Sequence, residues 1–135
     1  MPVPCTYDYA IVRVVPHVER GEFVNAGVIV ASTSRGFLKA AVELDETRLR
    51  ALDPAADVEA LRAALAAIPL ICAGGPGAGP IGRLSLRERF DWLVAPRSTS
   101  VQVSPVHSGR CVDLDAALQR LMQTMVQPMA RRPAG

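Results

Sequence analysis

Three segments with the alternating pattern of β-strands follow one another within the first 42 residues, separated only by short polar connections. We expect these strands at residues 7–15, 25–32 and 37–42, which are rich in the β-branched side chains that favour strands. The connection at 33–36 ends in Gly36, which is free to adopt the positive φ of a hairpin turn. The pattern therefore predicts a three-stranded antiparallel meander.

Helical patterns fill most of the remaining chain. Asp45, Asp57 and Asp113 each precede apolar residues at helical spacing, and Ser85 with Glu88 has the pattern of a capping box. Each of these residue types favours the start of a helix, because its side chain satisfies a free backbone N–H.

Two further segments complete the expected architecture. Residues 70–84 contain five Gly and two Pro, which predicts a flexible loop. Residues 101–103 alternate as a short strand, which Pro105 confines to an edge or an end of the sheet. We therefore predict an α+β fold, in which an antiparallel sheet (the meander plus this short strand) is packed by three to four helices.

A chain of 135 residues has the usual length of one domain, and 50% of its residues are hydrophobic, so it can bury a core. We expect a single α+β domain over residues 1–127 and a flexible C-terminal tail at 128–135. Three cysteines do not suggest a framework of disulfides. With no signal-peptide pattern and no apolar run long enough for a membrane span, we expect a cytoplasmic protein and no membrane partner.

The charge balance argues against nucleic acid as a partner. The formal net charge is only +2, and aromatic residues make up 4% of the chain, which leaves few side chains for stacking on bases. Lys39 is the only lysine, so Arg supplies nearly all positive charge. Nucleic-acid binding therefore ranks last among the functions considered.

Several familiar chemical motifs are absent or incomplete. Residues 77–82 match G-x-G-x-x-G, but Pro80 interrupts the turn, and Arg83-Leu84 stands where a phosphate loop requires Lys-Ser/Thr. The only histidines, His17 and His107, form no metal-binding motif, and no serine lies in a nucleophile elbow. We expect no cofactor and no metal.

A polar block between the first two strands is the most unusual stretch of the chain. It contains Arg20, Glu22 and Asn25, and Arg13 lies in the middle of the preceding strand. In a structural interpretation, Arg13 pairs with Glu22 or Glu19 and fastens the connection to the sheet, because a buried Arg needs a partner. In a functional interpretation, the block forms a pocket mouth whose guanidinium groups bind carboxylate or phosphate.

A second polar cluster surrounds the predicted short strand. It contains Arg97, Ser98, Ser104 and His107, and hydroxyl groups near an Arg are good ligands for anions. A structural alternative is a loop whose Ser and Thr side chains satisfy their own backbone. If both clusters lie on one side of the sheet, they form one composite site.

Two groups of residues resemble an uncharacterised bacterial family, domain of unknown function 3037, over residues 5–127 of this chain. The first group is Tyr7-Asp8-Tyr9, residues 11–16 and residues 20–28, and the second is Trp92-Leu93, Arg97-Ser98-Thr99, residues 104–109 and the helix around Leu121. The Gly/Pro-rich residues 73–82 lie outside the family pattern.

The resemblance implies no known activity. It implies an accessory role, because the genes of family members resemble, in their gene context, those of small partner proteins encoded beside kinase-like proteins of the persistence-toxin type. It points to Arg13, Arg20, Glu22, Asn25, Arg97 and His107 as site residues and assigns none of them a chemical role.

Three functional hypotheses follow, in order of preference. The first is a binding or accessory module that recognises an anionic small molecule or a protein partner, such as a kinase-like protein, through the two polar clusters. The second is a hydrolase or phosphoryl-transfer enzyme, with Glu22 or His107 as general base and Arg13, Arg20 or Arg97 stabilising negative charge. The third is nucleic-acid binding.

Overall fold

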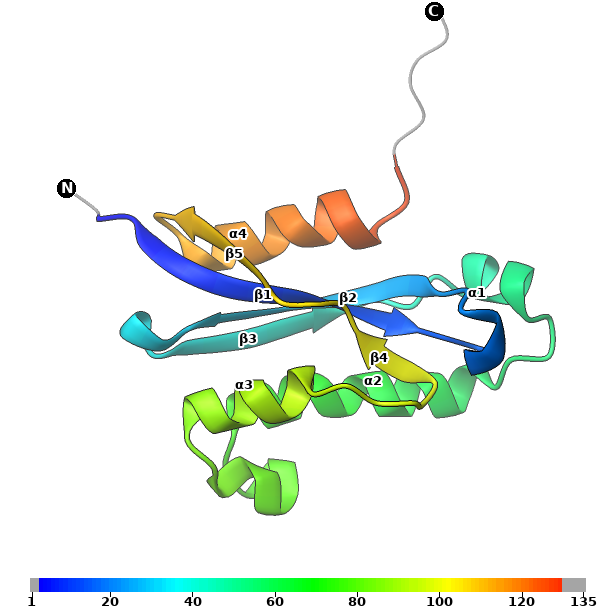
Figure 1. The fold of residues 1–135 in the computed structure, drawn as a ribbon, viewed down its shortest axis with the longest axis horizontal. Helices are drawn as coiled ribbons and strands as arrows, with labels where there is room; N and C mark the ends of the chain where they lie inside the picture. Colours follow the sequence, from blue (N-terminus) through cyan, green and yellow to red (C-terminus); the bar gives the residue numbers. More distant parts are fainter. Residues whose placement is uncertain (1–2, 130–135) are drawn as a thin grey trace, which may run out of the picture.

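A five-stranded antiparallel sheet lies between two helical layers in the computed structural model of the chain, which describes residues 3–129 (Figure 1). The strands are β1 (Cys5–Val14), β2 (Val24–Ser32), β3 (Phe37–Val42), β4 (Val101–Val103) and β5 (His107–Cys111). The order is β3-β2-β1, and β4 and β5 both pair with β1, each along a different part of it. The predicted α+β fold and its N-terminal meander are confirmed.

The helices are α1 (Glu46–Leu52), α2 (Val58–Ala73), α3 (Leu86–Val94) and α4 (Leu114–Leu121), and α4 continues into a π-helical turn at Met122–Val126. The predicted caps are present: the side chains of Asp45, Asp57 and Asp113 each accept a backbone N–H of the first turn. Ser85 and Glu88 form the predicted capping box of α3.

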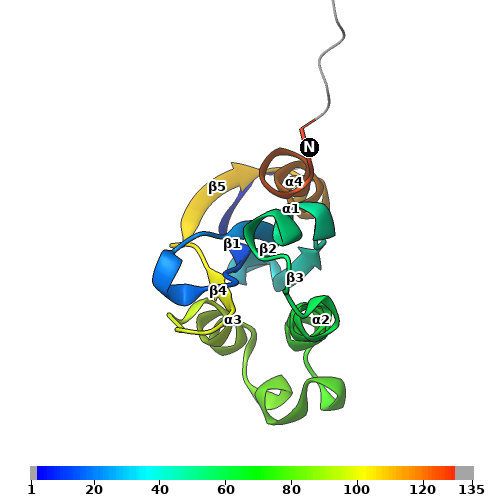
Figure 2. The ribbon, with the colours of Figure 1, turned by 90° about the vertical axis from the view of Figure 1, so that its right-hand side faces the viewer.

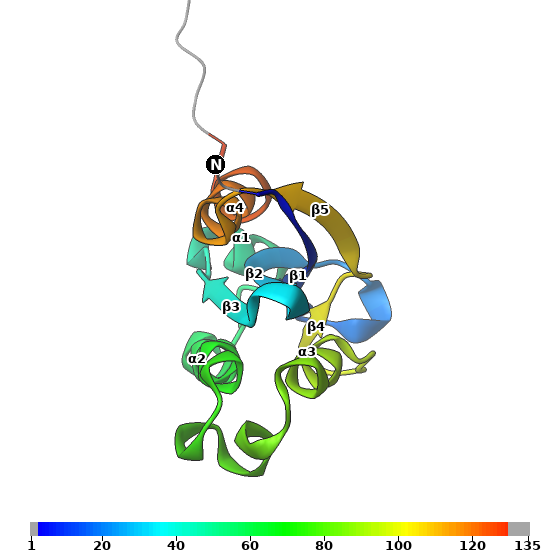
Figure 3. The same ribbon diagram turned by 90° about the vertical axis from the view of Figure 1, so that its left-hand side faces the viewer.

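Apolar side chains cover both faces of the sheet. Val12 and Val14 of β1 pack on one face against α2 and α3, through residues such as Leu65 and Phe90. On the other face, Ile11 and its neighbours pack against α4 and the π-helical turn. End-on views show α2 and α3 side by side below the sheet and α4 above it (Figures 2 and 3).

The Gly/Pro-rich stretch is more regular than expected. Helix α2 continues through Pro69 to Ala73, and residues 76–83 form 3₁₀ turns, which the backbone bond from Gly75 N–H to the Gly82 carbonyl closes at 3.1 Å. The prediction of a loop at 70–84 is therefore wrong at residues 70–73, which extend α2 beyond its internal Pro69, and the remaining residues form a connection of 3₁₀ turns.

Strand β5 is absent from the sequence-based prediction, which assigned its residues to a polar loop. Its sequence, His-Ser-Gly-Arg-Cys, has little strand propensity, but all five residues pair with β1, from Tyr9 opposite His107 to Cys5 opposite Cys111. Pairing with an existing strand decides the conformation here, as expected where tertiary context outweighs propensity.

A β-bulge interrupts the pairing of β1 with β2. Val12 lies opposite Gly27 but Arg13 lies opposite Asn25, so Ala26 is an extra residue on β2. A Cβ atom on Gly27 would come within 2.7 Å of the Ala41 carbonyl oxygen, so only glycine fits this close approach of β2 to β3. The bulge lies at the polar block and changes the direction of its side chains.

Among residues 3–129, no single helix is long and apolar enough to cross a membrane. Helix α2 and the 3₁₀ segment at residues 76–83 together have the length and apolar composition of a span, but the two are bent by 63° relative to each other. Of the predicted tail, residues 130–135 lie outside the described residues, and Pro128 and Met129 are exposed.

Candidate functional site

Strand β1 places Arg13 on the α4 side of the sheet. Its neighbours Val12 and Val14 are buried on the opposite face, so alternation turns Arg13 the other way. Asn25 of β2 and Gln102 of β4 lie directly opposite Arg13 on either side. Two residues with amide side chains therefore flank Arg13 in the sheet.

The Arg13 guanidinium has an aromatic neighbour and no ionic partner. Its Cζ lies 4.2 Å from the centroid of the Phe23 ring. Within residues 3–129 it forms no salt bridge, and its buried Nε has no hydrogen-bond partner. Asn25 donates from Nδ2 to the Met125 carbonyl at 2.9 Å, whereas its buried Oδ1 also lacks a partner. This part of the sheet thus contains two unsatisfied polar atoms on opposed residues.

The acidic residues of the polar block are engaged elsewhere, so the predicted pairing of Arg13 with Glu22 or Glu19 is wrong. Arg20 donates from Nε to Glu22 Oε1, and Glu19 Oε1 lies 3.8 Å from His17 Nδ1. The Arg20 hydrogen bond and charge lower the pKa of Glu22, and the same contacts raise the pKa of Arg20. The ion pair is at the end of the short 3₁₀ turn at Val18–Arg20 and is on the surface.

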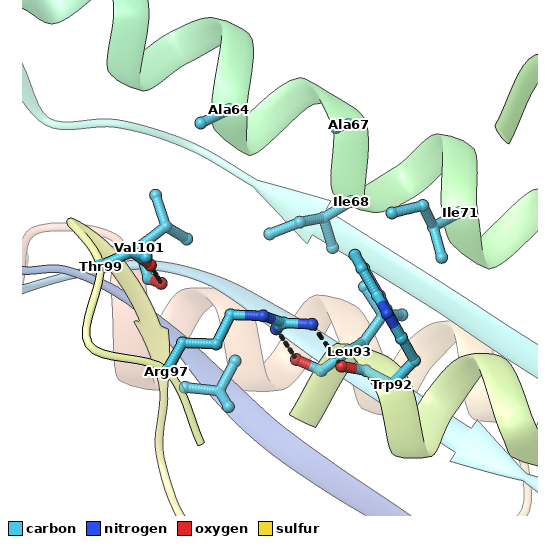
Figure 4. A pocket seen from close by; sticks show the side chains of 10 residues that line it. Ala64, Ala67, Ile68, Ile71, Trp92, Leu93, Arg97, Thr99 and Val101 are labelled. Carbon is cyan, nitrogen blue, oxygen red and sulfur yellow. Dashed lines mark hydrogen bonds between the residues drawn. The ribbon is translucent and has the colours of Figure 1, made fainter. Parts of the chain in front are cut away.

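Arg97 lies on the other face of the sheet, three residues after the last residue of α3, Val94. Its Nη1 donates to the Leu93 carbonyl at 3.1 Å and its Nη2 to the Trp92 carbonyl at 2.6 Å. The guanidinium also stacks on the Trp92 ring, with Cζ 4.3 Å from the centroid. Two hydrogen bonds and one ring therefore fix the orientation of this cation (Figure 4).

An open cavity of about 170 Å³ lies next to Arg97. Ala64, Ala67, Ile68 and Ile71 of α2 form one wall, and the side chains of the α3 end and of β4 form the other (Figure 4). Arg97 is the only charged residue in its lining, and Thr99 is the only other side chain with a polar group besides the Trp92 indole. Trp92 is 40% exposed and lines this cavity from α3.

The two serines of the second cluster differ in role. Ser104 is buried, and its Oγ accepts the Ile11 N–H at 2.8 Å and donates to the Pro105 carbonyl at 2.9 Å. The bond to Pro105 is local, as in the structural interpretation, whereas the bond from Ile11 joins Ser104 to β1 at the gap between β4 and β5. Ser98 is exposed in the bend before β4.

His107 is exposed at the start of β5, opposite Tyr9, with the two ring centroids 5.5 Å apart. Tyr9 precedes Arg13 by four residues, which corresponds to about 13 Å along a strand. Glu22 lies beyond the Arg13 end of β1, in the connection to β2. The structure therefore does not bring Glu22 and His107 together.

Arg13 and Arg97, one cation from each polar cluster, lie on opposite faces of the sheet, so the two clusters do not form one composite site. His107 pairs with Tyr9 and is on the Arg13 face, about 13 Å along β1 from Arg13. Arg13 faces the α4 side, whereas Arg97 lines the cavity with Val101 and Val103 on the α2 and α3 side. Gln102, which pairs with Arg13 in the sheet, borders a second hollow together with Arg97. We therefore treat them as two separate candidate sites.

Several residues of these sites were missed in the sequence. Gln102 alternates with two valines, and this pattern was a sufficient signal for a polar side chain beside Arg13. The wall of α2 had no such signal, because exposed alanines on a helix are common and only tertiary packing places them opposite Trp92. Among residues 3–129, no group of three His, Cys, Asp or Glu is placed to hold a metal ion.

Fold and sites together define a three-layer α+β domain with a candidate arginine site on each face of its sheet, at Arg13 and at Arg97. The chain belongs to the family described as protein of unknown function DUF3037, whose model matches residues 9–126. No curated protein and no solved structure matches the chain.

Proposed function

We propose that this protein is a binding module for a small organic anion, which occupies the cavity beside Arg97. The observation that supports this function is the composition of the cavity lining, in which one fixed guanidinium is the only charged group among mainly apolar side chains. Ligand sites of proteins commonly combine an apolar wall with a small number of placed polar groups.

The chemistry of the lining defines the class of ligand. Arg97 uses one N–H of each Nη group on a backbone carbonyl, which leaves further donors for a carboxylate. The apolar wall favours a non-polar body attached to that carboxylate. A cavity of about 150 Å³ holds a benzene ring in another protein, so 170 Å³ suits an aromatic or short branched carboxylate.

Titration with benzoate tests this proposal, followed by amide chemical shifts of α2, α3 and β4. We expect saturable binding with Kd of about 1 mM, and shifts concentrated around the cavity. Benzyl alcohol has a similar shape without the charge and should bind about 10-fold or more weakly. Equal binding of the two would show that Arg97 does not recognise the anion.

Two variants locate the binding site. Arg97→Gln removes the charge and should weaken benzoate binding about 10-fold or more, whereas Arg110→Gln, an exposed arginine on β5, should leave it unchanged. Ala67→Leu fills the cavity from α2 without touching the arginine and should abolish binding in a folded protein. Undiminished binding by Ala67→Leu would place the ligand elsewhere.

A second function, docking of an acidic protein segment, is favoured by the Arg13 site. A guanidinium without an ionic partner lies beside Phe23, which is 43% exposed, and a bidentate carboxylate would satisfy the cation. A partner of the kinase-like type fits the accessory role that the resemblance implies, and we propose the bacterial cytoplasm as the location of this pairing.

Photo-crosslinking inside the native cell tests the docking surface. A benzoylphenylalanine at position 23 should yield one defined adduct with an acidic segment of the partner, and Arg13→Gln should remove it. The same amino acid at Val106, which is also 43% exposed, serves as control and should give no adduct. An adduct that persists in Arg13→Gln would contradict recognition by this guanidinium.

The enzyme hypothesis gains less support from the geometry. A general base must lie within hydrogen-bond reach of the group on which it acts. Glu22 has Arg20 of the candidate set as its partner, but this ion pair is on the surface and lines neither of the hollows beside Arg97. Glu22 is held by Arg20, and His107 has Tyr9 as its neighbour. Binding without turnover is therefore the function that we favour.

A further inference from the structure

Cys5 and Cys111 lie directly opposite each other in the sheet. Cys5 is the first residue of β1 and Cys111 is the last residue of β5, and the antiparallel register pairs the two. Both are free thiols. Directly opposed residues point to the same face of a sheet, so the two side chains are neighbours.

The spacing of such a pair suits a disulfide. Opposed Cα atoms in antiparallel strands lie about 4.5 or 5.5 Å apart, and both values fall in the range of about 4.4–6.8 Å that disulfides span. The Cβ atoms of opposed residues are about 4.5–5.5 Å apart, compared with about 3.5–4.5 Å in a disulfide. The required approach of about 1 Å falls at the ends of both strands, where the ladder constrains the backbone least.

The two thiols differ in access, and the third cysteine is separate. Cys111 is half-buried and Cys5 is 7% exposed, so a reagent reaches Cys111 first. Burial raises the pKa of Cys111, and the charge and hydrogen bonding of Cys5 raise it further. Cys72 lies in the other core, against α2 and α3, where burial raises its pKa to about 12.

We propose that Cys5 and Cys111 form a reversible intramolecular disulfide by exchange with a low-molecular-weight disulfide such as glutathione disulfide. In the first step the Cys111 thiolate attacks one sulfur of glutathione disulfide, which forms a mixed disulfide and releases one glutathione thiolate. In the second step the Cys5 thiolate attacks the Cys111 sulfur and releases the second glutathione. The two protein thiols lose two protons and two electrons, and one glutathione disulfide becomes two glutathione molecules.

The disulfide would join the start of the sheet to the strand that leads into α4. Cys111 precedes Asp113, the N-cap of α4, by two residues. The disulfide would close a loop over residues 5–111, which contains all five strands and α1 to α3, and long loops give the largest restriction of the unfolded state. Oxidation should therefore raise Tm, and this inference is independent of the ligand cavity.

The test uses the full chain in a series of glutathione redox buffers at pH 8.5, quenched with acid and alkylated. We expect the mass of the monomer to fall by two hydrogens, and two of its three thiols to become unreactive toward the alkylating reagent at the same time. Dithiothreitol should reverse both changes. Tm of the oxidised protein should rise by about 5 °C or more. The variant Cys72→Ala should behave in the same way.

Single variants distinguish this disulfide from other products. Cys5→Ser should accumulate a glutathione adduct on Cys111. In Cys111→Ser, the two remaining thiols should not be lost together on oxidation. Three outcomes would overturn the proposal: a stable glutathione adduct on Cys111 in the wild-type protein, a disulfide-linked dimer, or an oxidised monomer with a lower Tm than the reduced one.

Discussion

Arg13 and Asn25 face each other across β1 and β2 at the β-bulge, and each keeps one buried polar atom without a hydrogen-bond partner. An unsatisfied buried group costs about 1–3 kcal/mol, so this arrangement does not contribute to stability. Bulges are frequent next to functional sites, where they change the direction of a side chain. Two opposed residues that weaken the fold at a bulge are consistent with a binding role.

Replacement of Arg13 should therefore be tolerated by the fold. Arg13→Met keeps an unbranched side chain beside Phe23 and removes the unpaired charge, so the free energy of unfolding should stay equal or rise by up to about 1 kcal/mol. Arg97→Met provides the contrast, because it loses two hydrogen bonds to carbonyls and should cost about 1–2 kcal/mol. Urea unfolding measures both. A loss above about 2 kcal/mol for Arg13→Met would show a structural role.

Ser104 should be the more important serine for stability. In Ser104→Ala the buried Ile11 N–H loses its acceptor, and we expect a loss of about 1–3 kcal/mol in the free energy of unfolding. Ser98→Ala serves as the control and should change it by less than about 0.5 kcal/mol, because Ser98 is exposed. Equal effects of the two would contradict the assigned role of the Ser104 hydroxyl.

Gly27 should not tolerate a side chain. In Gly27→Ala the new Cβ would lie 2.7 Å from the Ala41 carbonyl oxygen, so β2 and β3 must separate, at a cost of about 1–3 kcal/mol. Gly77→Ala is the matched control, since nothing lies within 4 Å of its Cβ position. Thermal unfolding compares the two, and a stable Gly27→Ala would mean that the strands do not approach so closely.

The surface ion pair should be visible in a titration. The Arg20 hydrogen bond lowers the pKa of Glu22 from its ordinary value of 4.5, and Arg20→Gln should return that pKa toward 4.5. Ser85 lowers the pKa of Glu88 by hydrogen bonds, which Arg20→Gln leaves intact, so Glu88 serves as internal control. NMR of the side-chain carboxyl carbons measures both values.

The direction of the associated stability change follows from the same pKa. Since the folded state holds the pKa of Glu22 below its unfolded value, the stabilisation is complete above about pH 4.5 and is lost as pH falls through the folded pKa. An unchanged Glu22 pKa in Arg20→Gln would contradict the assigned pairing.

Local signals in the sequence were sufficient for much of the fold. The meander and the helix starts at Asp45, Asp57, Ser85 and Asp113 depend on strand alternation and on side-chain caps, which involve residues close in the chain. Strand β5 was missed because its conformation depends on β1, about a hundred residues earlier in the sequence.

The sequence was sufficient to identify the key residues of the candidate sites, but it did not predict which residues contact one another there. Arg13 was correctly identified as an anomaly within a strand, but its ionic partner was assigned wrongly, because Glu22 is two residues from Arg20 and that local pairing takes precedence. The cavity at Arg97 depends on how α2 packs beside α3, and a helix pattern alone does not specify that packing.

Strand β1 would present a ten-residue edge if β4 and β5 did not cover it. The covering strands have only three and five residues, and Pro105, which has no N–H to donate, lies between them. Short and interrupted edges are poor templates for another β-strand. This side of the molecule is therefore protected against strand-by-strand aggregation.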